Sequence, residues 1–175
     1  MLQIILFILL GIIALILIAA AFMKKVYSIS ASIIIDKPQV EVFNYIKFLK
    51  NQEKYSKWVM ADPNVMMTYT GKDGEVGFKA AWVSKDKNVG VGEQEIVDII
   101  EGVGYKVEIR FEKPFKGISY ANNFTESIGN NQTKITTVFD TKTPFPMNIM
   151  VPIITKMLTK DMNENLTNLK KNLEV

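Results

Sequence analysis

Residues 154–173 read ITKMLTKDMNENLTNLKKNL and decide how the rest of the chain must fold. Apolar residues recur here at steps of four, four, four, three and four, the spacing that places them on one face of an α-helix of about six turns. The stripe consists of Ile154, Leu158, Met162, Leu166, Leu169 and Leu173. A helix with one apolar stripe must bury that stripe against another element, because its exposure to water is unfavourable.

The segment upstream of this helix, from residue 65 to residue 140, consists of short extended stretches separated by turn residues. In residues 105–112, Val107, Ile109 and Phe111 alternate with charged residues, which is typical of a strand with one buried face. The expected strands are 27–35, 65–70, 78–84, 91–100, 105–112, 118–126 and 133–140. Neighbouring strands joined by short turns form antiparallel sheets, and the apolar face of such a sheet is the only surface large enough to cover the last helix.

Two short helices are expected between the first and second strands. The motif Asp36-Lys37-Pro38 predicts a helix start with Asp36 as the N-cap. Apolar residues at helical spacing follow this motif up to Ile46, and residues 51–58 form a second short helical stretch. No low-complexity linker and no internal repeat interrupts the chain after residue 26, which indicates a single domain.

Residues 1–23 form a different class of segment. All but two of them are apolar, and no charged side chain precedes Lys24. A helix made of 20 such residues would be about 30 Å long, which matches the hydrocarbon core of a bilayer. The sequence therefore predicts a transmembrane anchor over residues 1–25 and a soluble domain over residues 26–175.

Two other interpretations of the first segment stay open. Ala19-Ala20-Ala21 offers the A-x-A cleavage site of a secretory signal peptide, although no basic residue precedes the apolar run and the run exceeds the usual length of about 7–15 residues. A buried core helix is the second interpretation, although core helices are rarely so long and free of charge. For an uncleaved anchor, Lys24 and Lys25 favour a single-pass membrane protein whose soluble domain lies in the cytoplasm.

The chain of 175 residues contains no cysteine and no histidine. This composition excludes disulfides, thiolate nucleophiles, Ser-His-Asp catalysis and imidazole or thiolate metal ligands. The net charge is +3, and Lys24 and Lys25 account for two of these charges. Arg110 is the only arginine and no basic stripe is present, so we expect no nucleic-acid partner. We also expect no metal and no cofactor.

Several motifs follow one another in the order strand, two helices, further strands and a long last helix. They are Asp36-Lys37-Pro38, Val42-Phe43-Asn44-Tyr45-Ile46, Tyr55-Ser56-Lys57-Trp58, Asp62-Pro63-Asn64, Gly90-Val91-Gly92-Glu93-Gln94-Glu95-Ile96, Phe111-Glu112-Lys113-Pro114-Phe115 and Asn165-Leu166-Thr167-Asn168-Leu169-Lys170. In this order they resemble the START-like, polyketide cyclase-like (SRPBCC) superfamily. The resemblance implies an α+β helix-grip fold, with a curled antiparallel sheet of about 6–7 strands packed on a long C-terminal helix, and a cavity between them.

Aromatic residues of the strands and short helices are the candidate lining of that cavity, since such side chains line concave sites for hydrophobic ligands. Phe78 and Trp82 share one strand face. Tyr120 and Phe124 share another. A purely structural role in the core is the competing interpretation for each, and methionines near the last helix add a flexible apolar surface. The candidate ligand-binding residues are Trp58, Phe78, Trp82, Tyr120, Phe124, Phe139 and Met150.

The sequence thus predicts a membrane-anchored domain that binds a small hydrophobic molecule or lipid, with residues 143–152 as its gate and no catalytic residue assigned. This hypothesis fails if the protein is consistently empty and encloses no cavity above about 300 Å³. The alternative is a cyclase or dehydratase whose polar pair comes from Tyr120 and Glu126. Glu93 and Glu95, on one strand face, are the other candidate pair. A protein-interaction module with a closed cavity is the third possibility.

Overall fold

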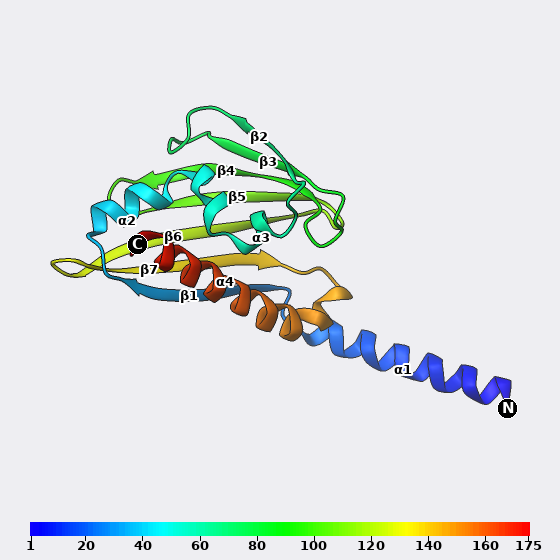
Figure 1. Ribbon diagram of the computed structural model, residues 1–175. Coiled ribbons are helices and arrows are strands. Elements are labelled where there is room, and N and C mark those ends of the chain that lie inside the picture. The colour runs from blue at the N-terminus through cyan, green and yellow to red at the C-terminus, as the bar shows by residue number, and fades with distance from the viewer.

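Seven antiparallel strands form one sheet in a computed structural model that describes all residues from Met1 to Val175 (Figure 1). The order across the sheet is β1-β7-β6-β5-β4-β3-β2, so only β1 lies beside a strand that is distant in sequence. The strands are β1 Val26–Ile35, β2 Met66–Thr70, β3 Lys79–Val83, β4 Val91–Ile100, β5 Gly104–Lys113, β6 Gly117–Gly129 and β7 Gln132–Lys142. Each strand expected from the sequence is present, with ends that differ by a few residues.

The helices of the body lie on one side of this sheet (Figure 1). The longest, α4, lies across the face of the sheet and contacts β1, where Lys170 Nζ near the C-terminal end of the helix donates to the Ile34 carbonyl at 2.8 Å. The helices are α2 Gln39–Ile46, the 3-10 turn η1 Leu49–Lys54, α3 Lys57–Met60, the 3-10 turn η2 Met147–Met150 and α4 Val151–Leu173. This arrangement is the helix-grip fold that the sequence predicts.

The stripe of α4 is buried as its spacing predicts. Met162, Leu166, Leu169 and Leu173 are all at most 6 % exposed. Each leucine buried in this way contributes about 1.5–3 kcal/mol of hydrophobic free energy. The two apolar residues nearest the start of the helix, Ile154 and Leu158, are only half-buried. The stripe of α4 is therefore buried more completely toward the C-terminal end of the helix.

The two faces of the sheet differ in what they carry. Val107, Ala121 and Phe139 lie side by side on the face that α4 covers, called the inner face here. Their neighbours Glu108 and Tyr120 are paired on the opposite, outer face. The inner face is apolar and the outer face is largely charged, as expected for an antiparallel sheet with one solvated side.

The N-terminal end of α2 differs from the prediction, because Asp36 does not cap it. The helix begins after Pro38, whose carbonyl accepts hydrogen bonds from the Glu41 and Val42 amides at 3.0 and 3.1 Å. A residue before proline prefers an extended backbone, which delays the helix start beyond the reach of the Asp36 side chain. Asp36 instead accepts a hydrogen bond from Gln132 Nε2 at 2.7 Å.

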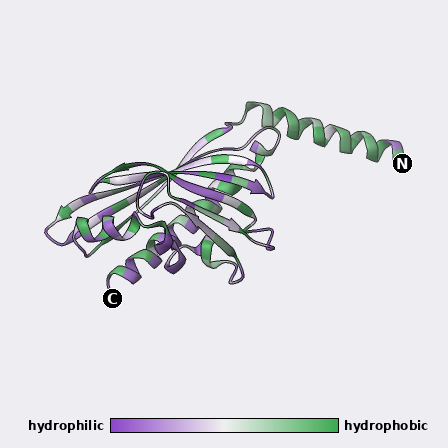
Figure 2. Cartoon of the chain, turned by 90° about the horizontal axis from the view of Figure 1, so that it is seen from above, coloured by the Kyte–Doolittle hydropathy of each residue, from purple (hydrophilic) through white to green (hydrophobic).

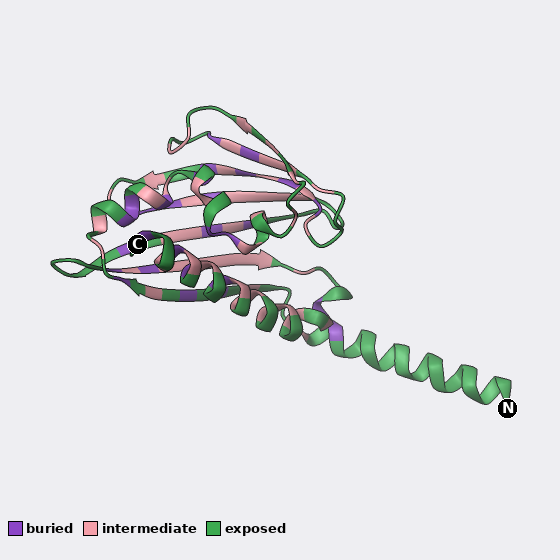
Figure 3. Cartoon of the chain, viewed as in Figure 1, coloured by how far each residue is buried: buried purple, intermediate pink, exposed green.

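Helix α1, Leu2–Phe22, projects away from the body (Figure 1). It is apolar along its length in Figure 2, and Figure 3 shows it exposed except near its C-terminal end. By length and composition it is the one helix of the chain able to cross a membrane. Only Ala20 of this helix is buried, at the point where α1 meets η2.

Candidate functional site

A cavity of about 110 Å³ lies between the inner face of the sheet and α4. Strands β4 to β7 form its floor, α4 its roof, and α2, η1 and α3 one wall. Two-thirds of its lining is apolar, which suits a hydrophobic ligand. The lining residues are Ile46, Gln52, Tyr55, Ser56, Trp58, Gln94, Tyr105, Val107, Ile109, Ala121, Asn123, Ile135, Thr137, Phe139, Met162, Asn165, Leu166 and Leu169.

The polar groups of the lining are amides and hydroxyls, and two pairs of them bond to each other. Thr137 Oγ1 donates to Asn123 Oδ1 at 2.8 Å, and Gln94 Nε2 donates to Gln52 Oε1 at 2.8 Å. No carboxylate and no amino group belongs to the lining. Since each pair still has unused donor and acceptor capacity, the cavity can orient one or two polar atoms of an otherwise apolar molecule.

Two phenols, Tyr55 and Tyr105, are buried in the wall of the cavity. Burial raises the pKa of Tyr55 well above its ordinary value, and the neighbouring phenols of Tyr105 and Tyr45 add to this rise. Burial likewise raises the pKa of Tyr105. Both groups are therefore neutral at physiological pH and serve as hydrogen-bonding groups rather than bases.

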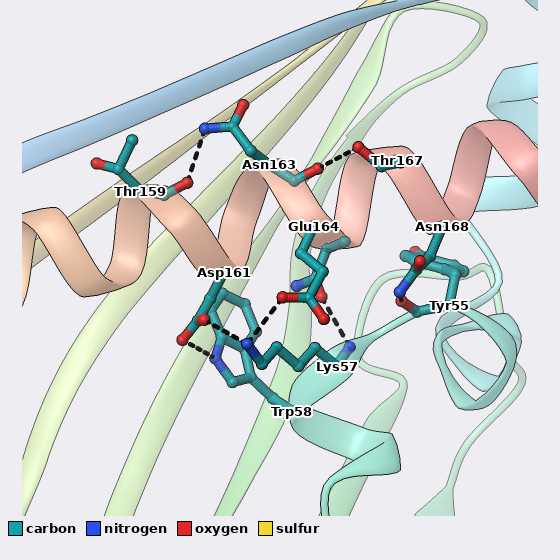
Figure 4. Close-up of polar contacts among 10 residues, drawn as sticks. Tyr55, Lys57, Trp58, Thr159, Asp161, Asn163, Glu164, Thr167 and Asn168 are labelled. Carbon is teal, nitrogen blue, oxygen red and sulfur yellow. Dashed lines mark hydrogen bonds and ion pairs between the residues drawn. The ribbon is translucent and has the colours of Figure 1, made fainter.

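Polar contacts between α3 and α4 close one side of the cavity (Figure 4). Lys57 Nζ pairs with Asp161 at 2.9 Å and with Glu164 at 2.8 Å, and these hydrogen bonds raise the pKa of Lys57. The Lys57 amide donates to Asn165 Oδ1 at 2.7 Å, and Trp58 Nε1 donates to Asp161 Oδ2 at 3.4 Å. This group of contacts, called the α3–α4 clasp here, is partly exposed, and water can replace its outer bonds from Lys57 to Glu164 and from Trp58 to Asp161.

Residues 27–174 match the family described as polyketide cyclase / dehydrase and lipid transport. The chain belongs to this family. A search of curated protein sequences finds no match.

Solved structures agree with the fold of the family. Norcoclaurine synthase from Thalictrum flavum, in complex with dopamine and hydroxybenzaldehyde, has 13% identity and a TM-score of 0.63 over 90% of this chain and 91% of its own. The hypothetical protein jhp0584 from Helicobacter pylori has 15% identity and a TM-score of 0.61 over 83% and 87%. Ara h 8.0201 has 13% identity and a TM-score of 0.56 over 85% and 97%. At these identities the likeness concerns the fold alone.

In this polyketide cyclase-like domain, two of the seven candidate ligand-binding residues line the cavity. Phe139 lies on its floor, and Trp58 stands at its edge as part of the α3–α4 clasp. Phe78 and Trp82 are on the inner face but outside the lining. Phe78 is buried against the ring of Tyr69, with the ring centroids 6.0 Å apart.

Trp82 and Met150 lie at the end of the domain next to α1. Trp82 Nε1 donates to the Val89 carbonyl at 3.2 Å, and its ring meets Phe111 edge-on at 6.0 Å. Met150 is the last residue of η2 and is 38% exposed. No residue of the predicted gate, 143–152, lines the cavity, because α4 covers it with its middle and C-terminal turns.

Tyr120 and Phe124 lie on the outer face, opposite the cavity. In β6 the residues that alternate with them, Ala121 and Asn123, point inward and line the cavity. Hydrophobicity predicts the aromatic residues of this strand in the interior, whereas its small and amide residues are the ones that face the cavity. Thr137 on the neighbouring strand β7 also lines the cavity.

The carboxylates considered for catalysis also lie on the outer face. Arg110 bonds to Glu93, Glu95 and Glu108 at once. The hydrogen bonds from Arg110 are the main cause that lowers the pKa of Glu95 and of Glu108. Tyr120 donates to Glu108 at 3.0 Å and completes this group, called the Arg110 cluster here. Glu126 is exposed on the same side, and no group of acidic side chains in the chain is arranged to hold a metal ion.

Proposed function

We propose that residues 26–175 form a binding domain for a small apolar molecule, which occupies the cavity between α4 and the inner face of the sheet. The observation that carries this proposal is the lining itself, which is mostly apolar and holds a few amide and hydroxyl groups without any charge. Burial of an apolar ligand in such a site contributes about 25 cal/mol of binding free energy for each Å² of apolar surface removed from water. The family, whose description includes lipid transport, supports the same class of ligand.

The size of the cavity limits what the closed domain can hold. At about 110 Å³ it is smaller than sites that enclose a whole drug-sized ligand, which occupy about 300–1,000 Å³. A dry apolar cavity of about 150 Å³ is enough for benzene. The closed form is somewhat smaller than that, so it suits the end of an alkyl chain, and an aromatic ring or a complete lipid requires the cavity to widen.

The α3–α4 clasp is the place where widening costs least. It consists of surface ion pairs and hydrogen bonds, whose loss is largely offset by water. By contrast, α4 contacts β1, and its residues Met162, Leu166 and Leu169 are buried in the hydrophobic core, so separating the helix from the sheet would expose apolar surface. We therefore place the entrance between α3 and α4 rather than at residues 143–152.

An enzyme of the cyclase or dehydratase class is the second candidate, and the position of the charged groups disfavours it. General acid–base catalysis needs a titratable group within hydrogen-bond reach of the substrate. Glu93, Glu95, Glu126 and Tyr120 all lie on the outer face, and the buried phenols hold their protons tightly. Binding of an apolar molecule needs no such group and requires only the apolar surface, amides and hydroxyls that line the cavity.

The same proposal assigns α1 the role of a single-pass membrane anchor with the domain on the cytoplasmic side. Support comes from the length, apolar composition and exposure of α1, and from Lys24 and Lys25 directly after it. An anchor of this kind holds the cavity beside compounds dissolved in the bilayer. A cleaved signal peptide would instead leave a mature chain that begins near Phe22.

Toluene titration of the full chain tests the cavity as a binding site. The chain contains 9 methionines, so their methyl groups can be labelled with ¹³C and followed by NMR in detergent micelles. Met162 is a lining residue and its methyl resonance should shift, whereas that of Met157, 55% exposed on the same helix, should not. Native mass spectrometry of protein taken from membranes should in addition detect a bound apolar molecule.

A matched pair of substitutions makes the test specific. Ala121→Leu adds three carbon atoms to the cavity floor and should weaken toluene binding at least about ten-fold. Ala81→Leu makes the same change on the outer face of β3 and should leave binding unchanged. The proposal would be overturned if the purified protein contained no bound molecule and the Met162 methyl resonance did not shift on addition of toluene. That result would favour a protein-interaction module with a closed cavity.

A further inference from the structure

One end of the sheet is held next to α1. Strand β1 begins at Val26, directly after α1, and Val26 pairs with Lys142 at the end of β7. Because all neighbours in the sheet are antiparallel, the β3–β4 connection and the β5–β6 turn reach the same end (Figure 1). This end is called the anchor end here, and it consists of residues 23–26, 84–90, 112–117 and 142–147.

The direction of α1 relative to the anchor end is fixed by bonds that are not part of the connecting backbone. Asn148, fully buried, donates from Nδ2 to the carbonyls of Ala20 and Met23. The Thr143 amide donates to the Lys25 carbonyl at 2.8 Å. Since α1 cannot swing without breaking these bonds, a membrane that contains α1 must lie on the side of the anchor end.

Positive charge is concentrated at the anchor end. Seven lysines lie there, all exposed and none in an ion pair. The carboxylates are Asp86 and Glu112 within these segments and Asp62, which bonds to Ser84. This is an excess of four positive charges in a chain whose net charge is +3, so the rest of the chain is slightly negative. The lysines are Lys24, Lys25, Lys85, Lys87, Lys113, Lys116 and Lys142.

Two exposed aromatic side chains lie among these lysines. Phe115 is 74% exposed in the β5–β6 turn, between Lys113-Pro114 and Lys116. Phe145 is 46% exposed between two prolines after β7. Aromatic rings flanked by lysines suit the headgroup region of a bilayer, where the rings lie among the upper acyl chains and the ammonium groups reach the phosphates.

We propose that the anchor end is a second membrane contact, in which Phe115 enters the headgroup region and the surrounding lysines bind anionic phospholipids. This inference rests on the proposed role of α1 as an anchor, which brings the bilayer to this surface. Its consequence is a fixed orientation of the domain: the sheet stands on the membrane by one end. Charge complementarity assigns the partner, since the cytoplasmic leaflet carries anionic lipids and each lysine near it contributes a measurable attraction.

The absence of native cysteine allows single fluorescent labels on the full chain. Strand β6 provides a matched pair of sites, because Gly117 lies at the anchor end and Gly129 at the opposite end of the same strand. A Cβ at Gly117 meets nothing within 4 Å, and one at Gly129 meets only Gln132 at 4.0 Å. The variants Gly117→Cys, Gly129→Cys and Ile8→Cys are each labelled and reconstituted into vesicles that carry a lipid-borne quencher.

In vesicles of phosphatidylcholine mixed with phosphatidylglycerol, the label at position 117 should be quenched and the label at position 129 should not. Lys113→Gln and Lys116→Gln should each lower the ratio of membrane-bound to free anchor end about five-fold. Phe115→Ser should lower it as well, whereas the exposed Lys171→Gln on α4 should have no effect.

The label at position 8 separates the two proposals. If it is quenched while position 117 is no more quenched than position 129, α1 is an anchor and the second contact is overturned. If position 8 is not quenched, the anchor and the inference that depends on it fail together. Equal quenching of position 117 in pure phosphatidylcholine, unaffected by the lysine substitutions, would overturn the assignment of anionic lipid.

Discussion

Asn148 and Ala20 are joined by a 2.6 Å hydrogen bond from the side-chain amide to the carbonyl, although they lie 128 residues apart. Both residues are fully buried where η2 meets the last turn of α1. The same amide donates to the Met23 carbonyl at 3.0 Å, while its own Oδ1 has no partner. One side chain thus bonds to two carbonyls at the end of α1, of which that of Ala20 also accepts from the Met23 amide, and holds the direction in which that helix leaves the domain.

We expect Asn148→Leu to loosen the junction between α1 and the body. The substitution removes two hydrogen bonds and leaves the part-buried Met23 carbonyl without this donor, which should lower the free energy of unfolding by about 1–3 kcal/mol. Chemical denaturation of the full chain in detergent measures this change. Spin labels placed in α1 and in the body should report a broader distance distribution than in the native chain.

The control for this variant is Asn44→Leu, which makes the same exchange at an exposed position of α2. It should change the unfolding free energy by less than about 0.5 kcal/mol and leave the distance distribution narrow. Equal effects of the two substitutions would show that Asn148 does not orient α1.

Gly92 allows the ring of Trp82 to lie against β4. A Cβ at this position would come within 2.6 Å of both Trp82 Cζ2 and the Arg110 carbonyl oxygen. Gly92→Ala should therefore force the ring away and lower the free energy of unfolding by about 1–3 kcal/mol. Gly117→Ala, which meets nothing within 4 Å, should be nearly neutral. Denaturation curves of the two variants that coincide would contradict this packing.

Removal of Asp161 should open the α3–α4 clasp. Asp161→Ala deletes one of the two partners of Lys57 Nζ and the partner of Trp58 Nε1, so the short helix α3 should separate from α4 more often. We expect amide hydrogen exchange of residues 55–60 to accelerate about two- to five-fold, as is usual for the loss of surface pairs. Lys160→Ala, an exposed residue without an ion pair, is the control and should not change the exchange rates.

The Arg110 cluster should contribute stability that depends on pH. Its hydrogen bonds lower the pKa of Glu95 and Glu108 below the ordinary value of 4.5 in the folded state. A carboxyl group with a depressed folded-state pKa stabilises the protein above its unfolded-state pKa, and that stabilisation is lost as the pH falls through the folded-state value. The unfolding free energy of the native chain should therefore decline below about pH 4.5.

Arg110→Met should remove this pH dependence. The variant should be less stable than the native chain at pH 7, and the two should converge as the pH falls through the folded-state pKa of the glutamates, because protonated glutamates no longer interact with the arginine. Denaturation at a series of pH values measures both curves. A constant difference between them at every pH would mean that Arg110 acts through packing and not through these carboxylates.

The sequence was informative where a periodic pattern had only one solution. The stripe from Ile154 to Leu173 could be buried only against a sheet, and it is. The alternation of Val107, Ile109 and Phe111 with charged residues predicted which face of β5 is buried, because the charged set cannot lie in a core. In both elements, the pattern of apolar and charged residues alone determines which face is buried.

In strand β6 the residue pattern does not predict which face is buried. Its two alternating sets are Tyr120, Asn122 and Phe124 on one side and Ser119, Ala121 and Asn123 on the other, so both contain polar residues. Hydrophobicity favours the aromatic set for the interior, and the structure places that set outside. The register with β5 and β7 decides the matter, since Ala121 is paired with Val107 and with Phe139, whose faces are already buried.

By itself, the sequence determined the positions of the strands, the last helix and the apolar segment over residues 1–23, because each depends on a local period or on length. The tertiary structure alone decided which residues meet in the cavity, that the glutamates of β4 and β5 face away from it, and that Asn148 receives the end of α1. These outcomes depend on strand register and on contacts between residues far apart in the chain, and no local pattern encodes them.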